Sequence, residues 1–153
     1  MVKNKMGMEK EKVVVIAGPT ASGKSGLAVE LSILLHGEIV NADSMQVYRG
    51  MDVGTAKPSP AERRIVPHHL LDVVDPDEDF NAAIYRSLAI PVIRDLHSIG
   101  KMCFVVGGTG LYIKALLGGL RSPGRPVPGE ALKHDARILV LETAERDLAP
   151  LLG

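Results

Sequence analysis

The sequence has few of the side chains that form disulfides or stack on nucleic-acid bases. It contains one cysteine, no tryptophan, three tyrosines and two phenylalanines in 153 residues. A single cysteine excludes an internal disulfide, and so few aromatic rings disfavour a surface that stacks successive bases. Cys103 lies in the apolar run 102–106, so we expect a buried strand thiol without a reactive role.

Net charge and long apolar runs are absent as well. Eighteen Lys and Arg balance eighteen Asp and Glu, so bulk charge gives no reason for non-specific binding to nucleic acid or anionic lipid. The apolar run at 13–17 is too short for a secretory signal or a membrane span. The composition, 46% hydrophobic and 24% charged, is that of a globular domain. It predicts a soluble, cytoplasmic protein with no membrane contact, and we expect a monomer.

Short apolar runs alternate with helical patterns along most of the chain. Buried strands are expected at 13–17, 38–42, 69–74, 102–106 and 137–141. Strands that alternate with helices form parallel sheets with helices on both faces. The pattern therefore predicts an α/β, three-layer fold with a mostly parallel sheet.

Two longer helices are expected between these strands. The first carries a stripe of Leu27, Leu31 and Leu34 and ends before Gly37, which suits a left-handed residue. The second begins after the capping residue Asn81 and is followed by Gly100, with a bend at Pro91. Its expected apolar face comprises Ile84, Leu88, Val92, Leu96 and Ile99. Shorter helices are expected at 60–65, inside a long loop, and at 111–117.

Composition divides the chain into four segments. A polar leader at 1–12 precedes the α/β core at 13–120. A linker rich in proline and glycine follows at 121–135, and 136–153 is expected to add a strand and a short helix.

A phosphate-binding motif follows the first strand directly. The residues are Gly18, Pro19, Thr20, Ala21, Ser22, Gly23, Lys24 and Ser25, which match G-x-x-x-x-G-K-[ST]. In such a loop backbone N–H groups surround phosphate oxygens, Lys24 adds positive charge, and the Ser25 hydroxyl can ligate Mg²⁺. The motif refines the prediction to a P-loop NTPase-like fold that binds a di- or triphosphate. A kinase, an NTPase and a diphosphate-releasing transferase all remain possible.

Asp43 stands at the end of the second expected strand. Ligands of open parallel sheets bind outside the carboxyl ends of the strands, so this acid is expected to face the phosphates. It could accept a proton from a hydroxyl or amine, or hold a water of a Mg²⁺ shell. The alternative is an aspartate that only caps a turn.

Three further motifs accompany the phosphate loop. They are NADSMQVYRGMDVGTAKP at 41–58, VPHHLLD at 66–72 and VGGTGLY at 106–112. In this order the motifs resemble the tRNA dimethylallyltransferase family, and the resemblance covers about residues 13–120. It implies transfer of a dimethylallyl group from dimethylallyl diphosphate to N6 of the adenine just 3′ of the tRNA anticodon, with Mg²⁺. The loop would then hold a leaving diphosphate rather than ATP.

The resemblance also implies roles for individual residues. Lys24, together with Mg²⁺ on Ser25, would stabilise the leaving diphosphate, while Asp43 deprotonates or orients the N6 amine. Thr109 would act with them, and the whole loop 18–25 would bind the donor diphosphate. Contacts with the tRNA anticodon stem-loop would come from Asp43, Ser44, Met45, Gln46 and Thr109. Thr20 would touch the donor or the base, although Thr20 and Thr109 could each serve only in a turn.

The chain also departs from the family. Its members carry a helical insertion that grips the anticodon stem-loop, and no such segment is expected here. A diphosphate- or nucleotide-binding module without catalysis is therefore an alternative. A small-molecule kinase is another, although no arginine-rich lid follows Gly110.

Other charged residues receive simpler interpretations. His68 and His69 are adjacent where a strand is expected to begin, and adjacent strand residues point to opposite faces, which disfavours a shared metal site. Arg49 and Lys57 flank the Asp43 loop and face either solvent or RNA phosphates. The acidic run 75–79 is expected to be a solvated loop.

Overall fold

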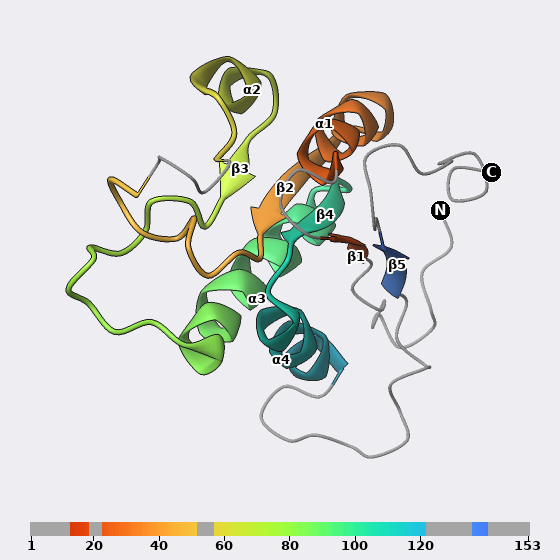
Figure 1. Cartoon of the computed structure of the whole chain (residues 1–153). Helices are drawn as coiled ribbons and strands as arrows, with labels where there is room; N and C mark the ends of the chain where they lie inside the picture. The colour runs from red at the N-terminus through yellow and green to blue at the C-terminus, as the bar shows by residue number, and fades with distance from the viewer. Residues whose placement is uncertain (1–12, 19–22, 52–56, 122–135, 141–153) are drawn as a thin grey trace.

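The computed structural model describes residues 13–18, 23–51, 57–121 and 136–140 (Figure 1). The predicted leader, linker and terminal helix lie outside these residues, as do Pro19, Thr20, Ala21 and Ser22. The division into four segments therefore stays a prediction.

Strands and helices alternate as the sequence predicts. The elements are β1 Val13–Ala17, α1 Lys24–Leu35, β2 Gly37–Asn41, α2 Pro60–Ile65, β3 His68–His69, α3 Ala82–Ser98, β4 Met102–Gly107, α4 Gly110–Arg121 and β5 Ala136–Val140. The sheet has the order β3-β2-β4-β1-β5, and all of its strand pairs are parallel. The carboxyl ends of β1, β2 and β4 therefore meet at one edge, where the loops that follow them come together.

Helices cover both faces of this sheet (Figure 1). On one face α1 packs Leu27 and Ala28 against Ile39 and Phe104. On the other face α3 and α4 pack against a second cluster, which includes Val40, Tyr85, Ile93, Val105 and Leu116. Neighbouring strand residues enter different clusters because successive side chains alternate across a strand. The predicted three-layer architecture is confirmed.

The predicted apolar face of α3 was largely wrong. The helix buries Tyr85, Ala89, Ile93 and Leu96, whereas Leu88 is 40% exposed and Ile99 66% exposed. The prediction followed the branched aliphatic residues alone. In the structure the ring of Tyr85 is buried and stacks on Tyr112 of α4, with centroids 4.7 Å apart, so the buried stripe begins one position later than predicted. The helix continues through Pro91 to Ser98, and a bend there stays a prediction.

The end of α1 also differs from its prediction. Leu34 is 72% exposed, and the buried residues are Leu27, Ala28, Val29 and Ser32. The left-handed residue after the helix is His36, with φ 54°, whereas Gly37 already begins β2. Glycine is required at 37 for another reason, since a Cβ there would lie 2.5 Å from Cε2 of Phe104.

The third strand is much shorter than predicted. It comprises His68–His69 alone, because Leu70 and Asp72 have φ of 65° and 54°, which ends extended backbone. Val74 forms only an isolated bridge with Tyr48. The short helix α2 has its predicted bounds and a capping box formed by Ser59 and Glu62. Cys103 is buried as predicted, and burial raises the pKa of its thiol to about 12.

His68 is half-buried at the edge of the sheet. Its Nδ1 lies 2.7 Å from the Val66 carbonyl oxygen, so Nδ1 carries the proton and donates it. Nε2 is then an acceptor, and within the described residues it is buried without a hydrogen-bond partner. Burial lowers the pKa of His68, the bond to Val66 opposes this, and the charge of Arg63 adds to the lowering.

Replacing Gly107 with alanine should destabilise the fold at the edge of the sheet. A Cβ at Gly107 would lie 2.2 Å from the backbone oxygen of Ala42, which cannot move without shifting β2. We expect Gly107→Ala to lower the free energy of unfolding by about 3 kcal/mol in urea denaturation. Gly26→Ala is the control, since no atom lies within 4 Å of its added Cβ, and alanine should stabilise α1 by about 0.5–1 kcal/mol. Equal effects of the two variants would contradict this account.

The lowered pKa of His68 predicts a pH-dependent contribution to stability. Below about pH 6.5 the unfolded state binds the proton that folded His68 resists, so folding stability falls as the pH falls. The stability advantage of the wild type over His68→Gln should therefore shrink between about pH 7.5 and 5.5. Urea midpoints of the two proteins measure it, and a difference that stays constant with pH would refute the lowered pKa.

Candidate functional site

A cleft of about 220 Å³ opens at the carboxyl edge of the sheet, between the start of α1, the end of β4 and the loop after β2. It is lined by Gly23, Lys24, Ser25, Ala28, Ile39, Asn41, Asp43, Gln46, Pro58, His68, Leu71, Val106 and Gly107. The cleft therefore brings together Gly23, Lys24 and Ser25 of the phosphate motif and four residues of the 41–58 motif, which are Asn41, Asp43, Gln46 and Pro58. Ser44, Met45, Thr109 and Gly18 are not among its lining residues.

The described end of the phosphate motif leads directly into α1. Gly23 has φ 87°, a left-handed conformation that glycine adopts without strain, and its carbonyl accepts the N–H of Leu27 at 3.1 Å. Lys24 is the first helical residue, and the first turn contains no acidic side chain. The positive end of the helix dipole thus faces the cleft without a carboxylate in that turn.

Lys24 and Asp43 influence each other across the cleft. Partial burial lowers the pKa of Lys24, and the negative charge of Asp43 opposes that lowering. A cleft that contains both a cation and an anion suits a ligand with phosphate at one end and a proton donor at the other.

The Asp43 carboxylate is oriented by the turn that follows β2. Its Oδ1 accepts the backbone N–H of Met45 at 2.8 Å and that of Gln46 at 3.2 Å. Asp43 therefore caps this turn. Since Asp43 also lines the cleft, the same cap orients its carboxylate in the cleft that Lys24 and Ser25 line. Its part in catalysis stays a prediction.

Thr109 connects the Asp43 turn to the glycine loop after β4. Its Oγ1 accepts the N–H of Ser44 at 2.9 Å, and its own N–H donates to the carbonyl of Ala42 at 3.1 Å. The neighbouring Gly108 lies against the phosphate loop, where a Cβ would be 2.9 Å from the Gly18 carbonyl oxygen. The loop after β4 therefore touches both Gly18 and the Asp43 turn, and Thr109 connects two loops, a role that the sequence did not reveal.

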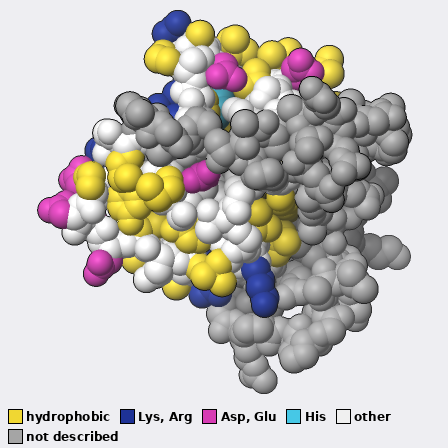
Figure 2. All heavy atoms as spheres, viewed as in Figure 1, with side chains coloured by type: hydrophobic (Ala, Val, Ile, Leu, Met, Phe, Trp, Pro, Cys, Tyr) yellow, Lys and Arg dark blue, Asp and Glu magenta, His cyan; other side chains and the backbone are white. Residues whose placement is uncertain are grey.

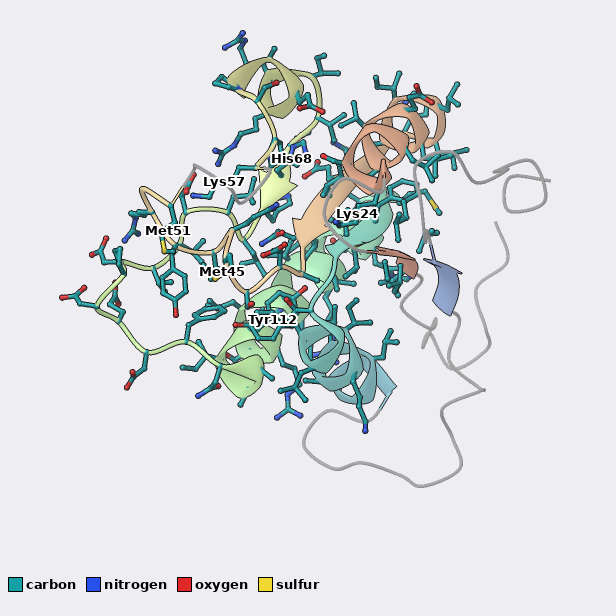
Figure 3. The ribbon with its side chains drawn as sticks, in the orientation of Figure 1. Lys24, Met45, Met51, Lys57, His68 and Tyr112 are labelled. Carbon is teal, nitrogen blue, oxygen red and sulfur yellow. The ribbon has the colours of Figure 1, made fainter. Side chains whose placement is uncertain are left out.

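The remaining predicted tRNA-contact residues differ in exposure. Gln46 is 9% exposed and lines the cleft, whereas Met45 is 45% exposed on the turn outside it. Figure 3 shows the side chains of Met45, Lys24 and His68 around this end of the sheet.

Sequence reasoning missed Asn41, the last residue of β2. Its side chain is buried, and Nδ2 donates to the carbonyl oxygens of Leu70 at 3.0 Å and Asp43 at 3.2 Å. Two carbonyl acceptors determine which side-chain atom is the nitrogen. An asparagine at the end of an otherwise apolar strand was the available signal, because buried amides need partners.

The interpretation of Lys57 as a residue that faces solvent or RNA was wrong. Its Nζ lies 2.6 Å from Oδ1 of Asp72 and donates to the Tyr48 carbonyl at 2.6 Å, and its side chain is 6% exposed. Arg49, by contrast, is 51% exposed and pairs with Asp75 at 2.8 Å. Lys57 and Arg49 both lie near Asp43 in the sequence, so sequence position alone could not show that Lys57 is buried whereas Arg49 is exposed.

The two histidines have different partners. His69 Nε2 lies 2.7 Å from Oε1 of the buried Glu38, whereas His68 donates to Val66. Within the described residues, no group of three or more His, Cys, Asp and Glu side chains could hold a metal ion.

Charged side chains are unevenly placed on the visible face of the molecule. Figure 2 shows acidic groups at its left edge, and the loop before α3 exposes Asp75, Asp77, Glu78 and Asp79 as predicted. The dark blue Lys and Arg side chains of the described residues lie apart from one another on this face (Figure 2). Among those residues no helix is both long and apolar enough to cross a bilayer.

Two solved structures share this fold at substantial sequence identity. The full-length tRNA isopentenylpyrophosphate transferase of Bacillus halodurans is 53% identical with a TM-score of 0.68, over 71% of this chain and 36% of that one. A eukaryotic dimethylallyltransferase, described as acting on tRNA, is 40% identical with a TM-score of 0.66, over 69% of this chain and 26% of that one.

Curated relatives agree with these structures. The tRNA dimethylallyltransferase 2 of Geotalea uraniireducens is 65% identical over 114 residues, which are 74% of this chain and 37% of that protein. The tRNA dimethylallyltransferase of Geobacter sulfurreducens is 62% identical over 130 residues, which are 84% of this chain and 42% of that protein. The chain thus spans less than half the length of these relatives.

Family models match almost the whole chain between them. The isopentenyl transferase model matches residues 11–72, and the IPP transferase model matches residues 46–150. Since the second match alone covers more than half of the sequence, and the motifs of the cleft fall within these ranges, the chain belongs to the IPP transferase family.

Proposed function

We propose that the cleft binds dimethylallyl diphosphate and directs its dimethylallyl group to N6 of the adenine just 3′ of the anticodon in tRNA. The observation that carries this proposal is the shared cleft of Lys24, Ser25 and Asp43. It combines groups that stabilise a leaving diphosphate with a carboxylate that can take a proton from the attacking amine. The curated relatives named above are tRNA dimethylallyltransferases, which supports the same reaction.

Lys24 and the start of α1 would act on the donor. As the C1–O bond of the donor breaks, its electron pair stays on the diphosphate, and negative charge builds on the bridging oxygen. The Lys24 ammonium and the N-terminal N–H groups of α1 offset that charge. The partial burial that lowers the pKa of Lys24 also strengthens its attraction to an anion in the cleft.

Asp43 would act on the acceptor. N6 of adenine forms the new bond to C1 of the donor and must lose a proton. Because the turn N–H groups of Met45 and Gln46 bind Oδ1, we assign the proton to Oδ2. Asp43 then orients the amine and takes its proton, while the turn prevents the carboxylate from rotating away.

Magnesium fits the oxygen groups of the cleft. Ser25 and Asp43 supply a hydroxyl and a carboxylate, which are hard ligands, and Mg²⁺ commonly takes only one or two protein oxygens together with substrate phosphates. We propose that Ser25 holds the ion. When bound, Mg²⁺ would neutralise charge on the departing diphosphate.

The tRNA anticodon stem-loop would approach the cleft over the Asp43 turn. Ser44, Met45 and Gln46 form this turn, and Thr109 is hydrogen-bonded to it. The exposed thioether of Met45 offers an apolar, polarisable contact for a base. Although the Thr109 Oγ1 accepts the Ser44 N–H, its hydroxyl proton can still be donated to RNA.

Incubation of the chain with dimethylallyl diphosphate, Mg²⁺ and a tRNA that carries unmodified adenine beside the anticodon tests the reaction. Mass spectrometry of the digested tRNA should detect the prenylated nucleoside. Binding of the donor without product would favour a diphosphate-binding module. Consumption of ATP with a small acceptor would favour a kinase.

Lys24→Ala should abolish measurable binding of dimethylallyl diphosphate in calorimetry. The variant loses the lysine charge at the phosphates, while the backbone of the motif remains. The melting temperature should change little, because the fold does not depend on this side chain. Lys114→Ala, at an exposed position of α4, is the matched control and should bind the donor like the wild type. Unchanged donor affinity in Lys24→Ala would remove Lys24 from the site.

Asp43→Asn should slow dimethylallyl transfer by roughly 10²–10⁴ while donor affinity stays within a few-fold. Asparagine keeps an oxygen that can accept the turn N–H groups but cannot take the N6 proton. Single-turnover rates at saturating tRNA measure the effect, with Asp77→Asn in the exposed acidic loop as control. Equal rates for Asp43→Asn and the wild type would exclude Asp43 as a base, and lost donor binding would assign it to the Mg²⁺ shell instead.

A further inference from the structure

The Asp43 turn is supported by a neighbouring segment of the chain. The N–H of Asp72 donates to the Gln46 carbonyl at 3.2 Å, and the N–H of Val73 donates to the Val47 carbonyl at 2.8 Å. The N–H of Gln46 in turn donates to Oδ1 of Asp43. The position of residues 70–74 therefore decides where the Asp43 carboxylate lies.

This supporting segment has a backbone conformation that needs to be held. Leu70 and Asp72 have φ of 65° and 54°, and neither is glycine. Left-handed conformations of such residues are strained and persist only where the surroundings fix them. Asn41 holds the Leu70 carbonyl from the sheet side. A different group must hold Asp72.

Lys57 and Arg63 hold Asp72 through its carboxylate. The Lys57 Nζ lies 2.6 Å from Oδ1, and Nη1 of Arg63 lies 3.0 Å from Oδ2. Burial alone would raise the pKa of Asp72, but hydrogen bonds from Lys57 and Arg63 outweigh it and lower the pKa. The carboxylate is therefore charged at neutral pH and bound at both oxygens.

Lys57 differs from Arg63 because it bonds to two segments of the chain, the one that carries Asp72 and the one that carries Tyr48. Its Nζ also donates to the carbonyl of Tyr48 at 2.6 Å, on the segment that continues from the Asp43 turn. Its side chain is 6% exposed, whereas that of Arg63 is 35% exposed. A buried ammonium with short bonds to two segments resists their separation. Lys57 does not line the cleft, although the adjacent Pro58 does.

We propose that Lys57 is a positioning residue for Asp43. It ties Tyr48 to Asp72, so that the N–H groups of the turn keep the Asp43 carboxylate aimed into the cleft. The kinetic part of this inference rests on the proposed transferase function. The structural part, that Lys57 holds the turn in place, rests only on the contacts given above.

A second ion pair between the same segments serves as control. Arg49 and Asp75 lie 2.8 Å apart, with side chains 51% and 55% exposed. Exposed pairs of this kind contribute little to stability, because water screens the charges. Asp75→Asn removes a charge between these segments without changing the pair of Lys57 and Asp72.

The experiment compares the wild type with Lys57→Met, Lys57→Arg and Asp75→Asn. Amide hydrogen exchange is measured for Gln46, Asp72 and Val73, with α3 as internal reference, together with donor affinity and the single-turnover rate. Lys57→Met should accelerate exchange of these amides about tenfold but not that of α3. It should slow transfer by about 10²-fold with donor affinity nearly unchanged, because misplacement of a catalytic group by about 1 Å has that effect. Lys57→Arg should restore part of the rate, and Asp75→Asn should match the wild type.

The outcomes separate this inference from the proposed function. Wild-type exchange at Gln46, Asp72 and Val73 in Lys57→Met would overturn it, as would an equal acceleration in α3, which would indicate a general stabilising role. An unchanged transfer rate with faster local exchange would also overturn the positioning role. A wild type that binds no donor and makes no product would refute the proposed function, while the exchange pattern would still decide whether Lys57 holds the turn.

Discussion

The backbones of β2 and β4 approach each other closely where both strands end. Gly107 lies so near Ala42 that a side chain at 107 would overlap the Ala42 backbone, and Thr109 then donates its N–H to the Ala42 carbonyl. This approach joins the glycine loop after β4 to the Asp43 turn after β2. The same glycine loop touches the phosphate loop at Gly18. The arrangement of the cleft depends on this small set of contacts between backbone groups.

Near the contact between Gly107 and Ala42, the same polar groups both stabilise the fold and line the cleft. Asp43 caps its own turn, and it also lines the cleft together with Lys24. Asn41 satisfies two carbonyl groups and thereby fixes the start of that turn. Preorganised groups do not have to be reordered when a ligand binds, which is the physical advantage of such double use.

The strength with which an ion pair holds its segments together depends on how buried the pair is. The buried Lys57 and the partly buried Asp72 hold two segments together, whereas the exposed Arg49 and Asp75 make a similar bond that water weakens. At the other end of β2 the buried Glu38 is held by His69 and Lys101, both at 2.7 Å. Ionised side chains with low exposure in the sheet region thus have close partners of opposite charge, as the free energy of desolvation demands.

The sequence by itself determined the features that depend on neighbouring residues. The apolar run at 13–17, the motif ending in Gly23, Lys24 and Ser25, and the capping residues Ser59 and Asn81 each act over a few positions, so their strands and helix ends were predictable. The parallel sheet followed from the alternation of these elements. The placement of Asp43 beside the phosphate motif followed from the rule for strand ends.

Only the tertiary structure decided the features that depend on distant partners. The face that α3 buries is set by Tyr112, the length of β3 by the left-handed Leu70 and Asp72, and the burial of Lys57 by Asp72. Thr109 is a structural link because Ser44 lies within hydrogen-bond distance of it, across 65 positions of sequence. No local sequence pattern encodes such pairs. Their free energy arises only when segments far apart in the chain pack together and exclude water, because each buried polar group then needs a hydrogen-bond partner from another segment.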